Sequence, residues 1–168
     1  PLDFSQAVAT PDWKQDSMFG VMPPRDLLLT VGNQIVEATM SQRARWFEYL
    51  AYRPLLQQFF REDPEFRWEA APKPRLVAES YVDGVEFWEY AESHTEEEQI
   101  ERFTKNKQWN LTEFEPLFDA ADIGRFGRDL FVQRSTTTNG AGIDWLRRHF
   151  PEHRVHEVLF YEAHPMHI

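Results

Sequence analysis

Two aspartates, Asp119 and Asp122, lie three positions apart in the stretch EPLFDAADIGRFGRD, residues 115–129. Only alanines separate them, and Phe118 and Ile123 flank the pair. An unpaired charge is costly to bury, so carboxylates set among apolar neighbours predict a cationic partner. The nature of that partner decides what chemistry this stretch performs.

A histidine near the end of the sequence is a candidate partner. His167 stands in the segment HPMHI, which follows a predicted strand. We expect it in a loop at a strand end, where binding and catalytic residues are frequent. The alternative is an exposed histidine without a role.

A third aspartate, Asp26, precedes another apolar run. A carboxylate orients a histidine and favours its protonated form, which suits acid–base catalysis. Separate carboxylates also bind a guanidinium through charge-assisted, bidentate hydrogen bonds. Asp26, the pair Asp119 and Asp122, and His167 therefore suit a cationic, arginine-like substrate. The alternative is that Asp26, like Asp129, is an ordinary charged residue at a strand end.

Other kinds of site have less support. His164 and His167 have a spacing that metal ligands tolerate, but there is no HExxH motif and no cysteine. The seven glycines form neither a GxGxxG nor a P-loop motif, and no GxSxG motif is present. We therefore expect neither a metal ion nor an organic cofactor.

Composition limits the class of protein. The 168 residues are 42% hydrophobic and 15% aromatic, which is enough for the core of one domain. The formal charge of −10 argues against a nucleic acid or an anionic membrane as partner. No apolar run approaches the roughly 20 residues of a membrane helix. Cytoplasm is the default expectation for the compartment.

Secondary structure in the first half is predicted from apolar runs. Residues 1–20 read as an extended lead-in. The runs 26–31 and 34–38 about a Gly-Asn turn indicate a hairpin. Ser41 is the expected cap of a helix in which Pro54 causes a kink or a break. Residues 63–74 are expected to be irregular, and residues 91–107 to form a solvated helix or surface loop.

The second half repeats this order. We expect a strand over 129–133, turn and capping residues over 135–142, a helix over 143–150 ended by Pro151, and a strand over 154–160. Residues 25–28 (RDLL) and 128–131 (RDLF) begin similar segments, which suggests two units of ββαβ type. The sequence thus predicts a mixed α/β fold.

Seven motifs in a fixed order resemble the amidinotransferase family, over a region from about residue 11 to the last residue. They are MPPRDLL at 22–28, VGN at 31–33, RARWFEY at 43–49, APKP at 71–74, FDAAD at 118–122, GRD at 127–129 and PMHI at 165–168. That family includes glycine amidinotransferase and relatives in streptomycin, cylindrospermopsin and saxitoxin biosynthesis. Further segments, such as 126–132 and 137–142, look more like the cyanobacterial toxin-pathway enzymes.

The resemblance implies a fold and a reaction. The fold is a partial five-bladed α/β propeller of the pentein type, with about two ββαβ modules present. Residues 1–168 would be one incomplete catalytic domain, with units at about 21–90 and 108–168. The reaction moves the amidino group of L-arginine to an acceptor amine through a covalent intermediate on a cysteine. The alternatives are an arginine deiminase-like hydrolase of the same fold and a non-catalytic arginine-binding module.

The resemblance also assigns roles to residues. Asp119 opens the FDAAD motif and would pair with the catalytic histidine, His167. Asp26 would bind the arginine guanidinium, and Asp122 would support the loop. Because the chain has no cysteine, we expect the sequence to be an incomplete part of a longer enzyme.

The partners implied are L-arginine and an acceptor amine, either glycine or an amine of a secondary-metabolite pathway. Family members are commonly dimers, so a homodimer is a candidate assembly. The mitochondrion is the alternative compartment if the protein is a eukaryotic glycine amidinotransferase.

Overall fold

The structure is a computed structural model that describes residues 8–10, 13–15, 24–160 and 167. Most of the predicted lead-in over residues 1–20 lies outside the described residues. Within it, β1 (Val8–Thr10) and β2 (Trp13–Gln15) form a short antiparallel hairpin.

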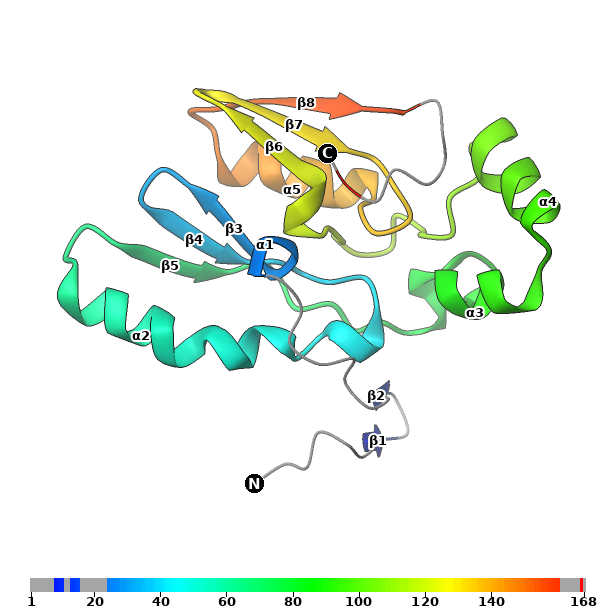
Figure 1. The fold of residues 1–168 in the computed structure, drawn as a ribbon, viewed down its shortest axis with the longest axis horizontal. Helices are drawn as coiled ribbons and strands as arrows, with labels where there is room; N and C mark the ends of the chain where they lie inside the picture. Colours follow the sequence, from blue (N-terminus) through cyan, green and yellow to red (C-terminus); the bar gives the residue numbers. More distant parts are fainter. Residues whose placement is uncertain (1–7, 11–12, 16–23, 161–166, 168) are drawn as a thin grey trace.

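A three-stranded mixed sheet forms the first unit (Figure 1). The strands β3 (Leu28–Val31) and β4 (Gln34–Glu37) are antiparallel, as the two apolar runs predict. Gly32 lies at φ +59° in the turn between them, a conformation that glycine adopts without strain. The helix α2 (Arg53–Glu62) then leads to β5 (Arg67–Ala70), which is parallel to β4.

The second unit has the same topology. The strands β6 (Ile123–Phe126) and β7 (Asp129–Gln133) are antiparallel, with Gly127 at φ +58° in the turn. The helix α5 (Gly140–His149) crosses over to β8 (Arg154–Val158), which is parallel to β7. The order strand, strand, helix, strand therefore occurs twice.

The internal repeat has a different register from the one that the sequence suggests. Residues 25–28 lie in α1 (Pro24–Leu27) and at the start of the first strand of their unit, whereas residues 128–131 enter the second strand. The two turn glycines, Gly32 and Gly127, occupy matching positions instead. The shared letters RDL are therefore not structurally equivalent.

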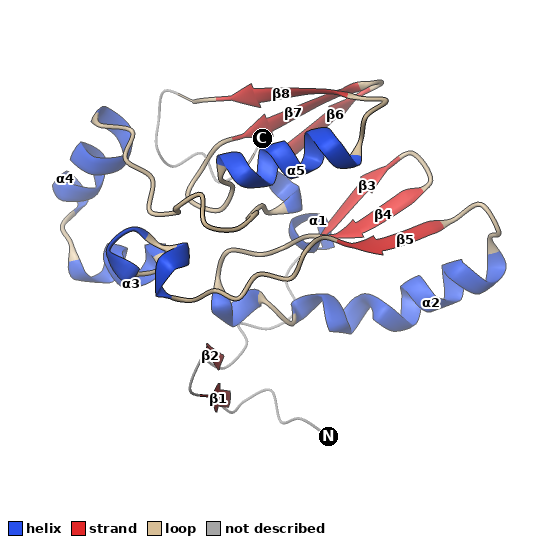
Figure 2. Cartoon of the chain, turned by 180° about the vertical axis from the view of Figure 1, so that it is seen from behind, coloured by secondary structure: helices blue, strands red, loops and turns tan. Residues whose placement is uncertain are grey.

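The two units share one hydrophobic core. Figures 1 and 2 show α5 between the two sheets and α2 on the outer face of the first sheet. One cluster of buried side chains includes Leu29 and Val36 from the first sheet, Leu130 from the second and Ile143 from α5. The two sheets are thus halves of one packed body.

A hydrogen-bonded segment before β6 joins the units. The hydroxyl of Thr39 donates to the carbonyl oxygen of Phe118 at 2.9 Å and accepts from its N–H at 2.6 Å. On the other side, the side chain of Asn139 accepts from the N–H of Leu117 at 3.0 Å. Residues 117–119 are therefore held between both units, and this fixes the backbone of the FDAAD motif.

Short helices and helical turns lie within and between the units. Two short α-helices, α3 (Phe87–Ser93) and α4 (Glu96–Gln99), lie between the units. The second of them continues as one turn of π-helix (Ile100–Lys105). The remaining turns are 3-10 helices: Arg43–Arg45, Glu48–Tyr52, Ala78–Ser80, Val82–Gly84 and Ala120–Asp122. The predicted polar segment 91–107 is helical but not wholly solvated, because Phe103 is fully buried against the rings of Phe87 and Tyr90.

Two local predictions were wrong. Ser41 does not cap a helix: the first 3-10 turn begins after Gln42, which makes no side-chain cap. The α-helix begins only at Arg53, because Pro54 is compatible with a first turn but not with a helix interior. Residues 63–74 are not all irregular, because β5 pairs with β4 within this segment.

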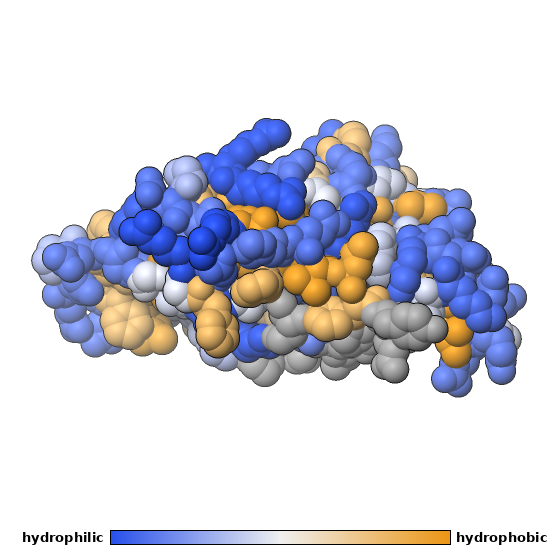
Figure 3. Space-filling model, turned by 90° about the horizontal axis from the view of Figure 1, so that it is seen from above, coloured by the Kyte–Doolittle hydropathy of each residue, from blue (hydrophilic) through white to orange (hydrophobic). Residues whose placement is uncertain are grey.

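The surface of the second unit carries apolar side chains among polar ones. Phe126, Phe131 and Leu159 are exposed, and Figure 3 shows apolar groups within a mostly hydrophilic face. No helix among the described residues is long and apolar enough to cross a membrane.

Close packing in α5 makes a test of this arrangement. A Cβ at Gly142 would overlap the carbonyl oxygen of Leu117, which is backbone and cannot move aside. We expect Gly142→Ala to lower the free energy of unfolding by about 1–3 kcal/mol, measured by urea denaturation. Gly140→Ala is the matched control, because its Cβ would meet only the flexible carboxylate of Glu113. Equal stability of the two variants would contradict this packing.

Candidate functional site

The predicted site residues come together where the two units meet. Asp26 lies in α1, which packs against the 3-10 turn Ala120–Asp122. Asp119 is the residue before that turn, and Asp122 is its last residue. His167 reaches the same place from the end of the chain. The four residues are thus neighbours in space despite their distance in sequence.

The direct partner of His167 is Asp122. Its Nδ1 lies 2.9 Å from Oδ1 of Asp122. The direct pairing of His167 with Asp119 that the resemblance implies is therefore not the contact in the structure. Asp119 acts on His167 over a longer distance, through its charge.

Three hydroxyl groups hold the carboxylate of Asp122. Its Oδ2 accepts from Ser135 at 2.7 Å, from Thr137 at 2.8 Å and from Thr138 at 2.6 Å. The side chain of Asp122 is 1% exposed. The three hydroxyl groups therefore fix the orientation of the Asp122 carboxylate.

The pKa of His167 is raised. The hydrogen bond to Asp122 is the largest cause and outweighs the opposing effect of burial. The negative charges of Asp122, Asp119 and Asp26 add to the shift. A histidine held in this way stays protonated to higher pH and can serve as a proton donor near neutrality.

Asp119 is the least satisfied of the carboxylates. It is 2% exposed, and its Oδ1 has no hydrogen-bond partner within the described part of the chain. Its Oδ2 lies 3.8 Å from Nη1 of Arg45. Burial and the nearby charge of Asp122 raise the pKa of Asp119 to about 8, against the opposite effects of Arg45 and His167. A bound cation would favour its ionised form.

Arg45 and Glu48 belong to the site, although sequence reasoning gave them no role. Nη2 of Arg45 donates to Oδ2 of Asp26 at 3.0 Å, and both Nε and Nη2 lie 3.2 Å from Oε2 of Glu48. Glu48 is completely buried, and its Oε1 has no hydrogen-bond partner among the described residues. The sequence shows their spacing of three residues in the motif RARWFEY, but this spacing alone does not indicate burial.

We call these six residues the junction cluster: Asp26, Arg45, Glu48, Asp119, Asp122 and His167. Four of them are acidic, while Arg45 is the permanent cation and His167 a titratable one. Two carboxylate oxygens in the cluster, on Glu48 and Asp119, are buried and have no hydrogen-bond partner in the part of the chain that the structure describes. Such an arrangement favours a further cation with hydrogen-bond donors, and a guanidinium has this chemistry.

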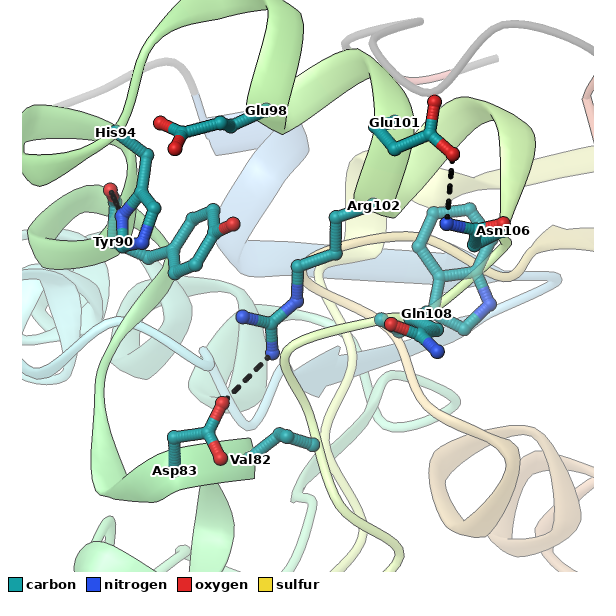
Figure 4. A pocket seen from close by; sticks show the side chains of 10 residues that line it. Val82, Asp83, Tyr90, His94, Glu98, Glu101, Arg102, Asn106 and Gln108 are labelled. Atoms are coloured by element: carbon teal, nitrogen blue, oxygen red, sulfur yellow. Dashed lines mark hydrogen bonds and ion pairs between the residues drawn. The ribbon is translucent and has the colours of Figure 1, made fainter.

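A surface hollow lies elsewhere, beside α3 and α4 (Figure 4). It has a volume of about 700 Å³, and Tyr90, Arg102 and Trp109 help to line it. Arg102 lies over the ring of Tyr90 and contacts Asp83 at 3.4 Å. No residue of the junction cluster lines this hollow, so the hollow and the cluster are separate places on the molecule.

Within the described residues, no three His, Asp or Glu side chains converge as ligands. His164, the other histidine considered for such a site, lies outside the described residues.

The contact between Asp122 and His167 can be tested by titration. We expect Asp122→Asn to lower the pKa of His167 toward the ordinary value of about 6.5, because the anionic acceptor is lost. The pKa is measured from the imidazole NMR signals as a function of pH. In the wild type, the pair stabilises the fold fully below that ordinary value and loses its effect as pH rises through the raised pKa. Asp129→Asn, which removes the partner of His156, should leave the His167 curve unchanged. An unaltered curve in Asp122→Asn would contradict the contact.

Comparisons with known proteins give a consistent result. No family model matches the chain. Glycine amidinotransferase, mitochondrial, of Gallus gallus is 45% identical over 169 residues, which cover 100% of this chain and 38% of that protein. L-arginine:L-lysine amidinotransferase of Pseudomonas savastanoi pv. phaseolicola is 40% identical and is covered to 42%. The chain thus spans well under half the length of these curated relatives.

Solved structures show the same similarity. SxtG, an amidinotransferase from Microseira wollei in the saxitoxin biosynthetic pathway, has a TM-score of 0.76 and 41% identity, covering 95% of this chain and 41% of that one. Inosamine-phosphate amidinotransferase StrB1 from Streptomyces griseus has a TM-score of 0.68 and 36% identity, covering 94% of this chain and 39% of that one. On these similarities of sequence and structure, the chain belongs to the amidinotransferase family.

Proposed function

We propose that the protein containing this chain transfers the amidino group of L-arginine to an acceptor amine. The observation that carries the proposal is the junction cluster, in which buried carboxylates already surround one guanidinium, that of Arg45. An environment that binds the guanidinium of a side chain has the chemistry to bind the guanidinium of a substrate. Asp26 is the residue that we assign to this binding.

The proposed reaction has two halves, and both use a cysteine thiolate from outside the 168 residues. In the first, the sulfur forms a bond to the guanidinium carbon and the bond from that carbon to Nε of arginine breaks. Ornithine departs after taking a proton from the imidazolium of His167. In the second, the acceptor amine bonds to the same carbon, the carbon–sulfur bond breaks, and neutral His167 takes the proton that the amine loses.

The remaining residues prepare His167 for these steps. Asp122 holds its Nδ1, which leaves Nε2 as the nitrogen that exchanges protons. Asp119 favours the imidazolium through its charge when it is ionised. Arginine binding would promote that ionisation, because a cation beside Asp119 lowers its pKa. We therefore assign His167 to proton transfer and Asp119 to its support.

The larger architecture is also a proposal. We propose that the two ββαβ units, at about 21–90 and 108–168, are modules of a five-bladed α/β propeller. Their common topology and shared core support this arrangement. So do the exposed apolar side chains on the second unit, which a neighbouring module would cover.

We propose a class of acceptor and two candidate compartments. The names of the relatives mention glycine, L-lysine and inosamine phosphate, so we propose only an amine. The name of the chicken relative places that protein in mitochondria. Fractionation of source cells would distinguish the two proposed compartments, cytoplasm and mitochondrion.

Product analysis tests the reaction. With arginine and a panel of amines that includes glycine and lysine, we expect the full-length protein to release ornithine continuously only when an acceptor is present. Without one, ornithine should stop at about one equivalent per active site, because the intermediate accumulates. Continuous citrulline formation without an acceptor would contradict transfer and indicate hydrolysis.

Substitution of Asp26 tests the binding assignment. We expect Asp26→Asn to raise the KM for arginine by about 10–100-fold, the value of a hydrogen bond to a charged group. The KM for the acceptor should change much less. Asp144→Asn is the matched control, because Asp144 is exposed and pairs with its helix neighbour Arg147 on α5. An unchanged KM for arginine in Asp26→Asn would remove Asp26 from the binding site.

A further inference from the structure

We infer that Arg45 is a positioning residue for the arginine site: it orients Asp26 and links it to Asp119 across the junction of the two units. The inference rests on the proposed function, because it concerns how the same site binds its substrate. Arg45 is not proposed to touch the reacting atoms.

The geometry of the guanidinium carries the inference. Arg45 stands in the 3-10 turn Arg43–Arg45 of the first unit. Nη2 donates to Asp26 at 3.0 Å and, with Nε, to Glu48 at 3.2 Å. Nη1 points to the other unit, 3.8 Å from Oδ2 of Asp119. All three nitrogens of one planar group are therefore engaged, each with an acidic residue.

Because these contacts are buried, the loss of any one of them has a large energetic effect. Arg45 is 8% exposed, Glu48 is 0% and Asp119 is 2%. Removal of one partner of a buried ion pair is strongly unfavourable, because the other charge stays buried without compensation. Arg45 serves three acidic partners at once, so its loss affects Asp26, Glu48 and Asp119 together.

The contact with Asp26 bears directly on substrate binding. A hydrogen bond to Oδ2 restricts rotation of the Asp26 carboxylate and sets the plane in which it can accept further donors. A bidentate contact with a substrate guanidinium depends on that plane. Without Arg45, the Asp26 carboxylate would lose this orientation and arginine would bind less tightly.

The contact with Asp119 bears on the pH dependence. The charged groups that act on Asp119 are Arg45 from the 3-10 turn, Asp26 from α1, Asp122 from its own turn and His167 from the end of the chain. Of these, Arg45 and His167 favour the ionised carboxylate. Loss of the Arg45 charge would therefore make Asp119 harder to ionise.

The guanidinium of arginine carries several nitrogen donors, and this distinguishes it from the single ammonium of lysine at this position. The Nε, Nη1 and Nη2 atoms reach in different directions, whereas an ammonium is a single point of charge. Arg45→Lys keeps the charge but not the three contacts. Arg45→Gln loses the charge as well and keeps at most part of the hydrogen bonding.

The experiment compares steady-state kinetics of full-length variants, with arginine and the acceptor varied separately. We expect Arg45→Gln to raise the KM for arginine at least 10-fold, with the KM for the acceptor within about 2-fold of wild type. In the pH profile of kcat/KM for arginine, the acidic limb should shift to higher pH by on the order of one unit. Arg45→Lys should raise the KM for arginine by an intermediate factor and leave that limb close to wild type.

Arg53→Gln is the matched control. Arg53 also contacts a completely buried glutamate, Glu37, at 3.3 Å, but the pair lies outside the junction cluster. We expect its variant to keep both KM values and the pH profile of wild type. This control separates a general loss of stability from a change in the arginine site.

Each outcome bears on a different statement. If the wild type produces no ornithine with any amine, the proposed function fails. If the wild type is active and Arg45→Gln keeps the arginine KM and the pH profile of wild type, the inference about Arg45 is overturned. Equal increases in both KM values would also overturn it, because they indicate a purely structural role.

A second variant covers the possibility that Arg45→Gln does not fold. Arg45→Gln combined with Glu48→Gln removes one charge of each sign and leaves no uncompensated Glu48. We expect this double variant to fold and to keep the raised KM for arginine. A folded double variant with the wild-type KM for arginine would overturn the inference.

Discussion

Burial of four carboxylates at the junction of the two units is the constraint on which this structure depends. An isolated buried charge is unfavourable by several kcal/mol even after the protein relaxes, and here only Arg45 is a permanent cation within the cluster. The chain meets the constraint in three ways. Arg45 binds Asp26 and Glu48, hydroxyl groups and His167 satisfy Asp122, and burial raises the pKa of Asp119, which disfavours its charged form. What is left over is the capacity to accept one more cation.

The scaffold holds this arrangement through backbone contacts rather than through the charges themselves. The segment 117–119 is bonded to Thr39 on one side and to Thr138 and Asn139 on the other. Thr138 also donates to Asp122, so the same residue positions the backbone of Asp119 and the side chain of Asp122. Asn139 caps α5 through Gly142 as well. A shift of α5 would therefore change the site.

Sequence patterns predict the first hairpin, the strand β7 and the helix α5, where apolar runs and turn residues agree, but the strand β6 was not predicted. The Gly-Asn turn gives β3 and β4, and the run of turn residues before α5 gives its Asn139 cap. The strand β5 was missed because prolines flank it and its pairing with β4 is a long-range contact. Which of Asp119 and Asp122 contacts His167 could not be predicted either. Both belong to one tight turn, and the hydroxyl groups that select Asp122 come from residues 135–138. Arg45 and Glu48 resemble an ordinary surface pair three residues apart, and only the fold shows that they are buried.

The repeat explains why acidic residues meet at this place. With Gly32 and Gly127 as matching turn positions, Asp26 and Asp122 both precede the first strand of their unit, two residues before β3 and immediately before β6. The two units have the same topology and share one core, so the residues just before β3 and just before β6 lie close together. The two carboxylates have different partners, a guanidinium for Asp26 and an imidazole for Asp122. The segment just before the first strand thus supplies the proposed binding group in one unit and the group that holds the proton carrier in the other.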